Sequence, residues 1–389
     1  MAEDTSAPGG YVPLVAVLRG GHVESVHHGA IAVVDDAGRT VASAGDPGAR
    51  TFLRSAAKPA QVLPLIGSGA ADLFGLTEPE IAVIIGSHGG EAMHLAAVRS
   101  ILSKIGLDER ALQCGAHPPL HPPAARELLD RGERPLPIHN NCSGKHAGML
   151  ALAVHLGAPL DTYLDPGHPV QVRIREVVAS LAGLPAASVD LAVDGCSAPT
   201  FHMPIRNAAL LYARLVSTEA AGRWRAAAGR VATAMRRHPE MVAGTDRLCT
   251  ALMRAAGHDL IAKIGAEGFY GLACRRGGTG MGIAIKIADG DGVRARHSAA
   301  LETLRGLGIL DERERVELLD RFVGPLRNRR GLPVGRVETV FRLDPAPAGR
   351  RGARADAASG GPCGPSVGPR RPAGGRRKPA PRAVTKVIS

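Results

Sequence analysis

The sequence predicts an α+β fold, in which strands from both ends of the chain build one sheet and helices occupy the middle. Apolar runs with strand-like alternation fill residues 11–46 and return at 258–292. Segments with helical periodicity and capping residues fill most of residues 54–237. Because strands at both ends frame a helical middle, we expect a mixed sheet made from the N- and C-terminal segments.

The first half of the chain alternates between strands, turns and helix starts. Three strands with Gly- and Asp-containing turns are expected within 11–46, followed by a helix from about 54 to 68. The next helix begins at "TEPEIAVIIG", where Thr77 can cap it and Glu80 stands at the capping-box position. The stretch "SHGGE" then breaks the helical pattern, which resumes through residue 106.

The middle and the end of the chain continue this pattern. Residues 114–140 are rich in Pro and His and are predicted to be mostly loop. A helix capped by Ser143 and a helix with Pro169 near its start follow. Two more helices are expected within 204–237, and two helices after the last strands close the ordered part.

A change of composition divides the chain into residues 1–344, predicted to form one catalytic domain, and residues 345–389, predicted to be a disordered tail. The tail has eight Pro, eight Gly, ten Lys or Arg and one Asp. It carries +9 of the total net charge of +12, so the first 344 residues are close to neutral. A basic tail without aromatic residues or a reading helix is a weak signal for nucleic acid, and we expect at most weak binding there.

Cysteine use and hydropathy indicate a soluble protein of a reducing compartment. The six cysteines are scattered through 389 residues, unlike the dense frameworks of small secreted domains. The N-terminus has no apolar core of the signal-peptide kind, and no apolar run reaches the ~18 residues of a membrane span. We therefore expect a cytoplasmic protein.

The stretch "RSAAKP" holds the first candidate for chemistry. Ser55 and Lys58 stand three residues apart, which is one helical turn, so both side chains would share a face. A lysine that is desolvated or near another cation can take the proton of a serine and make it a nucleophile. By itself this spacing is common, and the alternative is the first turn of an ordinary helix.

Two further motifs strengthen the hypothesis that Ser55 and Lys58 form a catalytic pair. Serine β-lactamases and penicillin-binding proteins carry S-x-x-K, then S-D-N, then K-T-G along the chain. This sequence has Ser55 to Lys58, then "SHG" from Ser87, then "KIG" from Lys263. The order and the predicted loop and strand contexts agree, whereas the middle motif and the Thr of the third differ.

A second candidate site lies in "NNCSGKHAG" and "DGCSAPT". Cys142 and Lys145 stand three apart at a predicted helix start, and Cys196 follows a short apolar strand. Thiols at a helix N-terminus have lowered pKa values and readily bind metals or react, and two Cys near a His would suit zinc. The alternative is that both cysteines are simply buried.

The stretch "GGTGMG" at 277–282 looks like a phosphate-binding loop. This interpretation is rejected, because strand and turn follow the stretch instead of a helix.

Taken together, the motifs resemble those of the asparaginase II family, the thermolabile rhizobial type of L-asparaginase. The resemblance covers roughly residues 11–340. It rests on these motifs in this order: "RSAAKP", "GSHGGE", "NNCSGKHAG", "DGCSAPT", "RHPEMVAGTDR" and "KIGAEG".

This resemblance implies a fold similar to serine β-lactamases and glutaminases, and hydrolysis of L-asparagine to L-aspartate and ammonia. The family's two Ser-Lys pairs map onto Ser55 with Lys58 and Ser87 with Lys263. With Ser55 as the nucleophile and Lys58 as its base, Ser87 and Lys263 would extend the proton relay. The resemblance further implies a homodimer.

The resemblance also implies a zinc ion, held by residues that map onto Cys142, Lys145 and Cys196. Lysine is an unusual zinc ligand, because it must first lose its proton. Arg54, Asp194 and His146 stand beside these motifs and are candidates for contacts to the substrate or around the metal.

Two other functions stay open at this point. A glutaminase, or an amidase for another small amide, is the nearest alternative, because one methylene in a pocket is worth only ~1–3 kcal/mol. A nucleic-acid-associated protein acting through its tail is the more distant one, and it predicts that removing residues 345–389 abolishes salt-sensitive DNA binding while amidase activity is unaffected.

Overall fold

The computed structural model describes residues 9–345, apart from residue 218 and residues 256–258. The tail predicted for residues 345–389 lies outside the described residues except for Pro345, which ends the last strand. Among the described residues, no helix is long and apolar enough to cross a bilayer.

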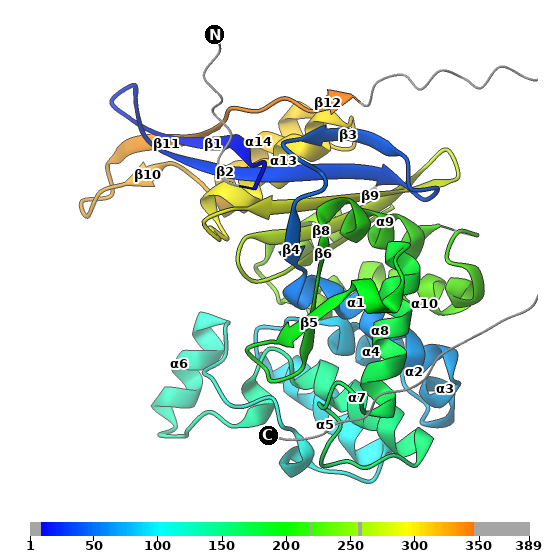
Figure 1. Cartoon of the computed structure of the whole chain (residues 1–389). Coiled ribbons are helices and arrows are strands. Elements are labelled where there is room, and N and C mark those ends of the chain that lie inside the picture. The colour runs from blue at the N-terminus through cyan, green and yellow to red at the C-terminus, as the bar shows by residue number, and fades with distance from the viewer. Residues whose placement is uncertain (1–8, 218, 256–258, 346–389) are drawn as a thin grey trace, which may run out of the picture. The chain divides into compact units, whose positions relative to one another are not determined.

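The larger sheet has nine strands, drawn from both ends of the chain (Figure 1). Its main path is β10 (Leu326–Arg327), β11 (Pro333–Thr339), β1 (Val12–Arg19), β2 (His22–Asp35), β9 (Thr279–Ile287), β8 (Phe269–Arg276) and β7 (Leu260–Ile264). Beside this path, β3 (Thr40–Ala44) pairs with β2 and with β12 (Asp344–Pro345). The predicted α+β class and the origin of the sheet in the two ends are confirmed.

Each pairing between the described strands is antiparallel, whereas the sequence analysis expected a mixed sheet. For the pairs of strands that follow one another in the chain, the reason is the short connection. The strands β1, β2 and β3 follow one another through turns, as do β7, β8 and β9, and a short turn can only join antiparallel neighbours.

Helices cover both faces of the sheet. The helix α9 (Ile205–Val216) packs on β2, β8 and β9, and α13 (Arg294–Gly306) packs on β1, β9 and β11 and also against α14 (Glu312–Phe322). Strand β9 turns its small residues toward α9: a Cβ on Gly282 would lie 1.9 Å from the Ala209 carbonyl oxygen. Side chains alternate along a strand, so the isoleucines of β9 face the other side.

The helical middle lies on the α9 side of the sheet (Figure 1). Its α-helices are α1 (Lys58–Gln61), α2 (Leu63–Gly67), α3 (Ala70–Leu73), α4 (Glu78–Ile85), α5 (Ala92–Lys104), α6 (Pro122–Asp130), α7 (Ser143–Leu156), α8 (Pro169–Ala182), α10 (Arg225–Arg237), α11 (Pro239–Ala243) and α12 (Leu248–Arg254). The predicted capping box of α4 is present: the Thr77 amide donates to the Glu80 carboxylate at 2.7 Å.

Three details differ from the sequence-based expectation. Helix α6 lies within the segment predicted as loop, because Pro122 and Pro123 start a helix as readily as they break one. Ser143 is not a cap: it is buried in the first turn of α7 and donates to the Ile138 carbonyl at 2.9 Å. A second, three-stranded sheet forms in the order β4 (Arg50–Phe52), β6 (Pro199–Pro204), β5 (Asp190–Val193).

Candidate functional site

The Ser-x-x-Lys motif forms the entry to the helical middle. The short 3-10 helix η1 (Arg54–Ala57) carries Ser55, and Lys58 begins α1 directly after it. The end of β7 comes close here, because a Cβ on Gly265 would lie only 2.5 Å from the Leu53 carbonyl oxygen. Glycine at this position therefore lets the strand that carries Lys263 approach the turn that carries Ser55.

Ser87 lies between the two predicted catalytic lysines. It follows α4, and its hydroxyl oxygen is 3.1 Å from Lys58 Nζ and 2.7 Å from Lys263 Nζ. Lys58 Nζ also donates to the carbonyl oxygens of Gly86 and Asn141, and Lys263 Nζ donates to the Ile264 carbonyl at 2.9 Å. The two lysines are only 1% exposed. Residues far apart in the sequence thus form one buried Lys-Ser-Lys cluster.

Burial makes both lysines easier to deprotonate. The pKa of Lys263 is well below its ordinary value, because burial disfavours the ammonium and the Lys58 charge repels it. Burial also lowers the pKa of Lys58, although the Cys142 sulfur partly opposes this. A neutral amine, which a general base requires, is therefore accessible at this cluster.

Ser55 is half-buried and stands apart from this hydrogen-bonded cluster. Among the described residues, no side-chain hydrogen bond is made by its hydroxyl, and Lys58 Nζ points to Ser87 instead. The preceding residue, Arg54, has a left-handed φ of +49°, which an L-residue adopts only under strain. As a residue of the first helical turn, Ser55 also presents a backbone N–H without an intrahelical acceptor.

The cysteine motif forms a second cluster at the start of α7. Lys145 Nζ donates to Cys196 Sγ at 3.0 Å, and the Cys142 amide donates to Asn140 Oδ1 at 2.8 Å. Gly144 sets the position of this helix, because a Cβ there would lie 2.2 Å from the Val83 carbonyl oxygen of α4. The close approach brings the cysteine motif beside the end of α4, from which Ser87 emerges.

The pKa values of the two thiols shift in opposite directions. A hydrogen bond from Cys196 holds the pKa of Cys142 well below its ordinary value, with the positive charges of Lys58 and Lys145 adding to the effect. The pKa of Cys196 is raised by its hydrogen bond to Cys142 and by burial. Burial alone would lower the pKa of Lys145, but the two sulfurs raise it. The cluster therefore favours ionisation of Cys142 over that of Cys196.

Arg54 and Asp194 form the rim of the second cluster. Arg54 Nε donates to Asp194 Oδ1 at 2.8 Å, and the two side chains are 25% and 11% exposed. Burial would raise the pKa of Asp194, but Lys145 and Arg54 lower it overall. Ser197, next to Cys196, also has a left-handed φ, of +69°. Both strained residues of this region adjoin predicted site residues.

The sequence matches the L-asparaginase II family over residues 15–339, which is most of the chain. The chain belongs to the L-asparaginase II family. No curated protein matches the sequence.

Solved structures give a distant likeness to this asparaginase II chain. The crystal structure of Mglu in its native form in the presence of 4.3 M NaCl is 17% identical, with a TM-score of 0.39, and the match covers 71% of this chain and 60% of that one. Mglu in its glutamate form is 15% identical, with a TM-score of 0.40 and coverage of 73% and 62%. The chain thus spans about three fifths of the length of these Mglu chains.

The zinc site predicted from the family resemblance can be compared with the residues present. Among the described residues, no group of three or more His, Cys, Asp and Glu side chains could hold a metal ion. The predicted ligand set instead combines two thiols with an amine, and Lys145 Nζ and Cys196 Sγ are already neighbours. Sulfur and nitrogen donors are those that zinc prefers, so the residues fit once Lys145 releases its proton.

His146 is fully buried and takes no part in either cluster. Its Nδ1 lies 2.7 Å from the Tyr163 hydroxyl, and its Nε2 has no partner among the described residues. Its pKa is lowered by burial and by the Lys145 charge. This buried imidazole therefore ties α7 to Tyr163.

Sequence reasoning missed the residues that hold the two clusters in place. His117 accepts a hydrogen bond from the Asn141 amide at 3.1 Å, and His88 Nε2 lies 3.0 Å from Ser143 Oγ. His117 lies in the part of 114–140 that is loop, as the sequence predicted. The carbonyl oxygens of Gly86 and Asn141 could not be found from sequence, because any residue supplies a carbonyl.

Proposed function

We propose that the protein hydrolyses the side-chain amide of L-asparagine to L-aspartate and ammonia through an ester of Ser55. The observation that carries this proposal is the buried Ser87 hydroxyl within hydrogen-bonding distance of both Lys58 and Lys263. A serine between two lysines serves proton transfer, and a structural role alone would not repay the burial of two amines.

The hydrogen-bond partners distinguish the two lysines. Lys58 Nζ has three oxygen acceptors, which match the three N–H groups of an ammonium. Lys263 Nζ has one carbonyl acceptor and the Ser87 hydroxyl, which match a neutral amine that donates once and accepts the serine proton. We therefore assign the resting charge to Lys58, in line with the lower pKa of Lys263.

This charge assignment gives the relay its direction. Lys58 passes a proton to Ser87 Oγ while Ser87 passes its own to Lys263, which leaves Lys58 neutral. Neutral Lys58 then takes the proton of Ser55 as Ser55 Oγ attacks the amide carbon. The relay returns a proton to the leaving nitrogen, the C–N bond breaks, and ammonia departs. Water then hydrolyses the ester of Ser55 and releases L-aspartate.

Ser55 is the better nucleophile of the two serines on three grounds. It is partly exposed, whereas Ser87 is only 5% exposed and has two lysines around it. The strained Arg54 before it fixes its turn. Its own N–H can stabilise the developing oxyanion, and one such donor is worth ~3 kcal/mol. The contact from Ser55 to Lys58 would form on substrate binding, as catalytic hydrogen bonds often do.

The cysteine cluster would hold the zinc ion, with Cys142, Cys196 and Lys145 as its ligands. When bound, the ion supplies a fixed positive charge beside the reaction site. Asp194 lies beside this cluster and next to Arg54, and we assign it to the ammonium group of the substrate. His146 is too deeply buried to touch substrate, so we place it in support of Lys145. A homodimer, implied by the family resemblance, belongs to the same proposal and is tested by sedimentation.

The experiment measures ammonia release from L-asparagine and L-glutamine side by side, with Ser55→Ala and Ser87→Ala as controls. Release from asparagine that is lost in Ser55→Ala supports the proposal, and a preference for glutamine changes the substrate. Release that persists in Ser55→Ala but not in Ser87→Ala would transfer the nucleophile to Ser87. No release from either amide by folded protein with zinc supplied would refute the proposed reaction.

A further inference from the structure

A cavity of about 420 Å³ lies beside the loop that carries Ser87. One wall is Gly89 and Glu91, directly after the serine, and the second contains Leu120 and His121. The third wall is the stretch 243–247, the end of the "RHPEMVAGTDR" motif. The motif is one of those shared with the asparaginase II family, yet none of its residues takes part in the proposed reaction.

The walls of this cavity are bonded to the reactive loop. The Ser87 amide donates to the Val242 carbonyl at 2.8 Å, and the His121 amide donates to the Gly89 carbonyl at 2.9 Å. The Glu91 carboxylate accepts from both the amide and the hydroxyl of Thr245. The third wall is therefore bonded to Ser87 through Val242, and three residues further on Thr245 bonds it to Glu91.

Among the described residues that line this cavity, Arg247 is a charged side chain without an ion-pair partner. Glu91 is already bound by Thr245, and Asp246 accepts from Arg321 at 3.2 Å. Arg247 is half-buried, and among the described residues it forms no ion pair and no side-chain hydrogen bond. A guanidinium that lines a cavity and has no acceptor within the protein is available to a ligand that supplies one.

A second basic side chain reinforces the positive character of this region. Arg296 donates to the Gly265 carbonyl at 2.9 Å, two residues after Lys263, and its own Nε has no partner among the described residues. Both Arg296 and Arg247 lower the pKa of His297, after the larger effect of burial. After the larger effect of burial, Arg247 also lowers the pKa of Arg296, so the two guanidinium groups act on each other and on the same histidine.

We propose that Arg247 binds the α-carboxylate of the amino-acid substrate within this cavity. The inference rests on the proposed amidase function and adds to it the recognition of the other end of the substrate. A carboxylate pairs with a guanidinium through two parallel hydrogen bonds, which fixes orientation as well as affinity. Two other arginines lie near the reaction site, but Arg54 Nε is already bonded to Asp194 and Arg296 donates to the Gly265 carbonyl. Arg247 is therefore a specificity-determining residue for amides that carry a carboxylate.

The test compares L-asparagine with 3-aminopropanamide, which is asparagine without its α-carboxylate. Arg247→Met should lower kcat/KM for asparagine by roughly 10- to 150-fold, the range for a lost charge-assisted hydrogen bond, mainly through KM. It should leave 3-aminopropanamide unchanged, and Arg247→Lys should fall between the wild type and Arg247→Met. The matched control is Arg254→Met, in the following helix, where the arginine pairs with Glu240 on the surface.

Two outcomes would overturn the inference. Asparagine turnover within about twofold of the wild type in Arg247→Met would remove Arg247 from the substrate, as would an equal loss for both amides, which indicates a structural role. Calorimetric binding of L-aspartate gives an arm that does not need turnover. Its loss in Arg247→Met supports the subsite even if no amide is hydrolysed, and unchanged binding refutes it. Failure of the wild type to release ammonia refutes the proposed reaction instead.

Discussion

Replacing Lys263 by methionine tests the Lys-Ser-Lys cluster, because it removes a buried amine and keeps a chain of similar length. In the proposed relay Lys263 takes the proton of Ser87, so that Lys58 can act as the base. Its loss should reduce turnover by the ~10²- to 10⁴-fold that a positioned acid or base contributes. KM should change little, because Lys263 contacts Ser87 and a backbone carbonyl.

Stability should change in the opposite direction. The pKa of Lys263 in the folded protein is well below 10.5, so the unfolded chain binds more protons between the folded pKa and pH 10.5. Folding stability of the wild type therefore rises with pH through this window. Each pH unit between the two pKa values corresponds to ~1.4 kcal/mol. At neutral pH Lys263→Met should be at least as stable as the wild type, and its advantage should disappear above pH 10.5.

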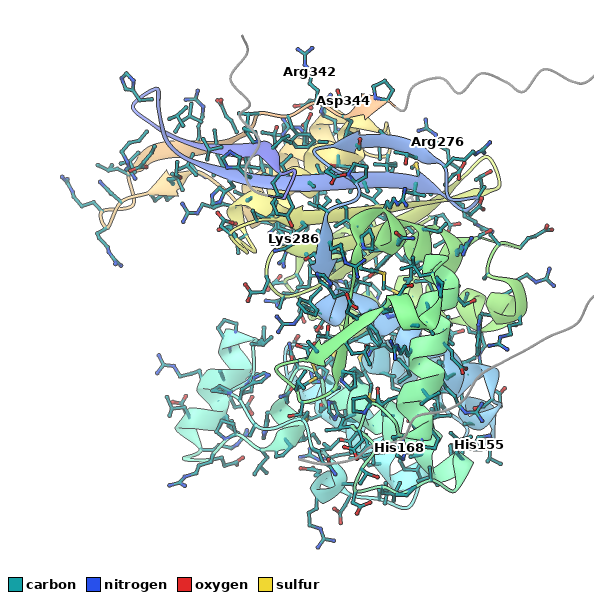
Figure 2. The ribbon with its side chains drawn as sticks, in the orientation of Figure 1. His155, His168, Arg276, Lys286, Arg342 and Asp344 are labelled. Carbon is teal, nitrogen blue, oxygen red and sulfur yellow. The ribbon has the colours of Figure 1, made fainter. Side chains whose placement is uncertain are left out.

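The assay combines ammonia release with urea unfolding at several pH values. Lys286→Met is the matched control. Its lysine lies on β9, two strands from β7, on the side of the sheet toward the helical middle (Figure 2). It donates to the backbone carbonyls of Glu267 and Ile287. That variant should keep its turnover. If Lys263→Met kept turnover within tenfold of the wild type, or lost stability at neutral pH by several kcal/mol, the neutral-amine assignment would be wrong.

Two further predictions concern the cysteine cluster and its helix. Cys142→Ala or Cys196→Ala should lower the zinc content found by elemental analysis and raise KM more than it lowers kcat, whereas the buried Cys274→Ala should keep the metal; unchanged zinc in all three would return both cysteines to the core. Gly144→Ala places a Cβ 2.2 Å from the Val83 carbonyl oxygen and should cost ~1–3 kcal/mol in urea unfolding, with reduced turnover, while Gly229→Ala, which has open space in α10, should be neutral or stabilising.

The fold was accessible from sequence where local signals are strong. Alternation predicted the strands at both ends, and caps such as Thr77 predicted the helix starts. The antiparallel pairing of consecutive strands follows from the lengths of their connections and not from alternation. The short strands β4, β5 and β6 have too few residues for a periodic signal. Helix α6 was not predicted, because Pro122 and Pro123 favour a loop in a Pro-rich segment, although proline is also common in the first turn of a helix.

The candidate site was predictable as a set of residues but not as a geometry. Motif spacing named Ser55, Lys58, Ser87 and Lys263, and the structure brings the last three together around one hydroxyl. Spacing could not indicate that Lys58 points to Ser87, since that contact depends on the loop after α4. Arg247 was within a quoted motif, yet its missing partner becomes visible only when the neighbouring carboxylates have been assigned to other groups.

The two clusters form one line of charges, and this order explains how so many cations can be buried together. Burial acts to lower the pKa of Lys58 and that of Lys145, whereas the Cys142 sulfur acts to raise both, so the sulfur is a counter-charge to both lysines. Lys145 in turn faces Asp194, which is paired with Arg54 at the rim. Each charge on this line thus has an opposite neighbour, as buried charges require. Lys263 differs from the other lysines, because burial and then the like charge of Lys58 lower its pKa and the more weakly acting sulfurs of Cys249 and Cys142 do not offset this. Lys263 is therefore the lysine that becomes neutral, and the substrate's reactive bond is proposed to lie beside it.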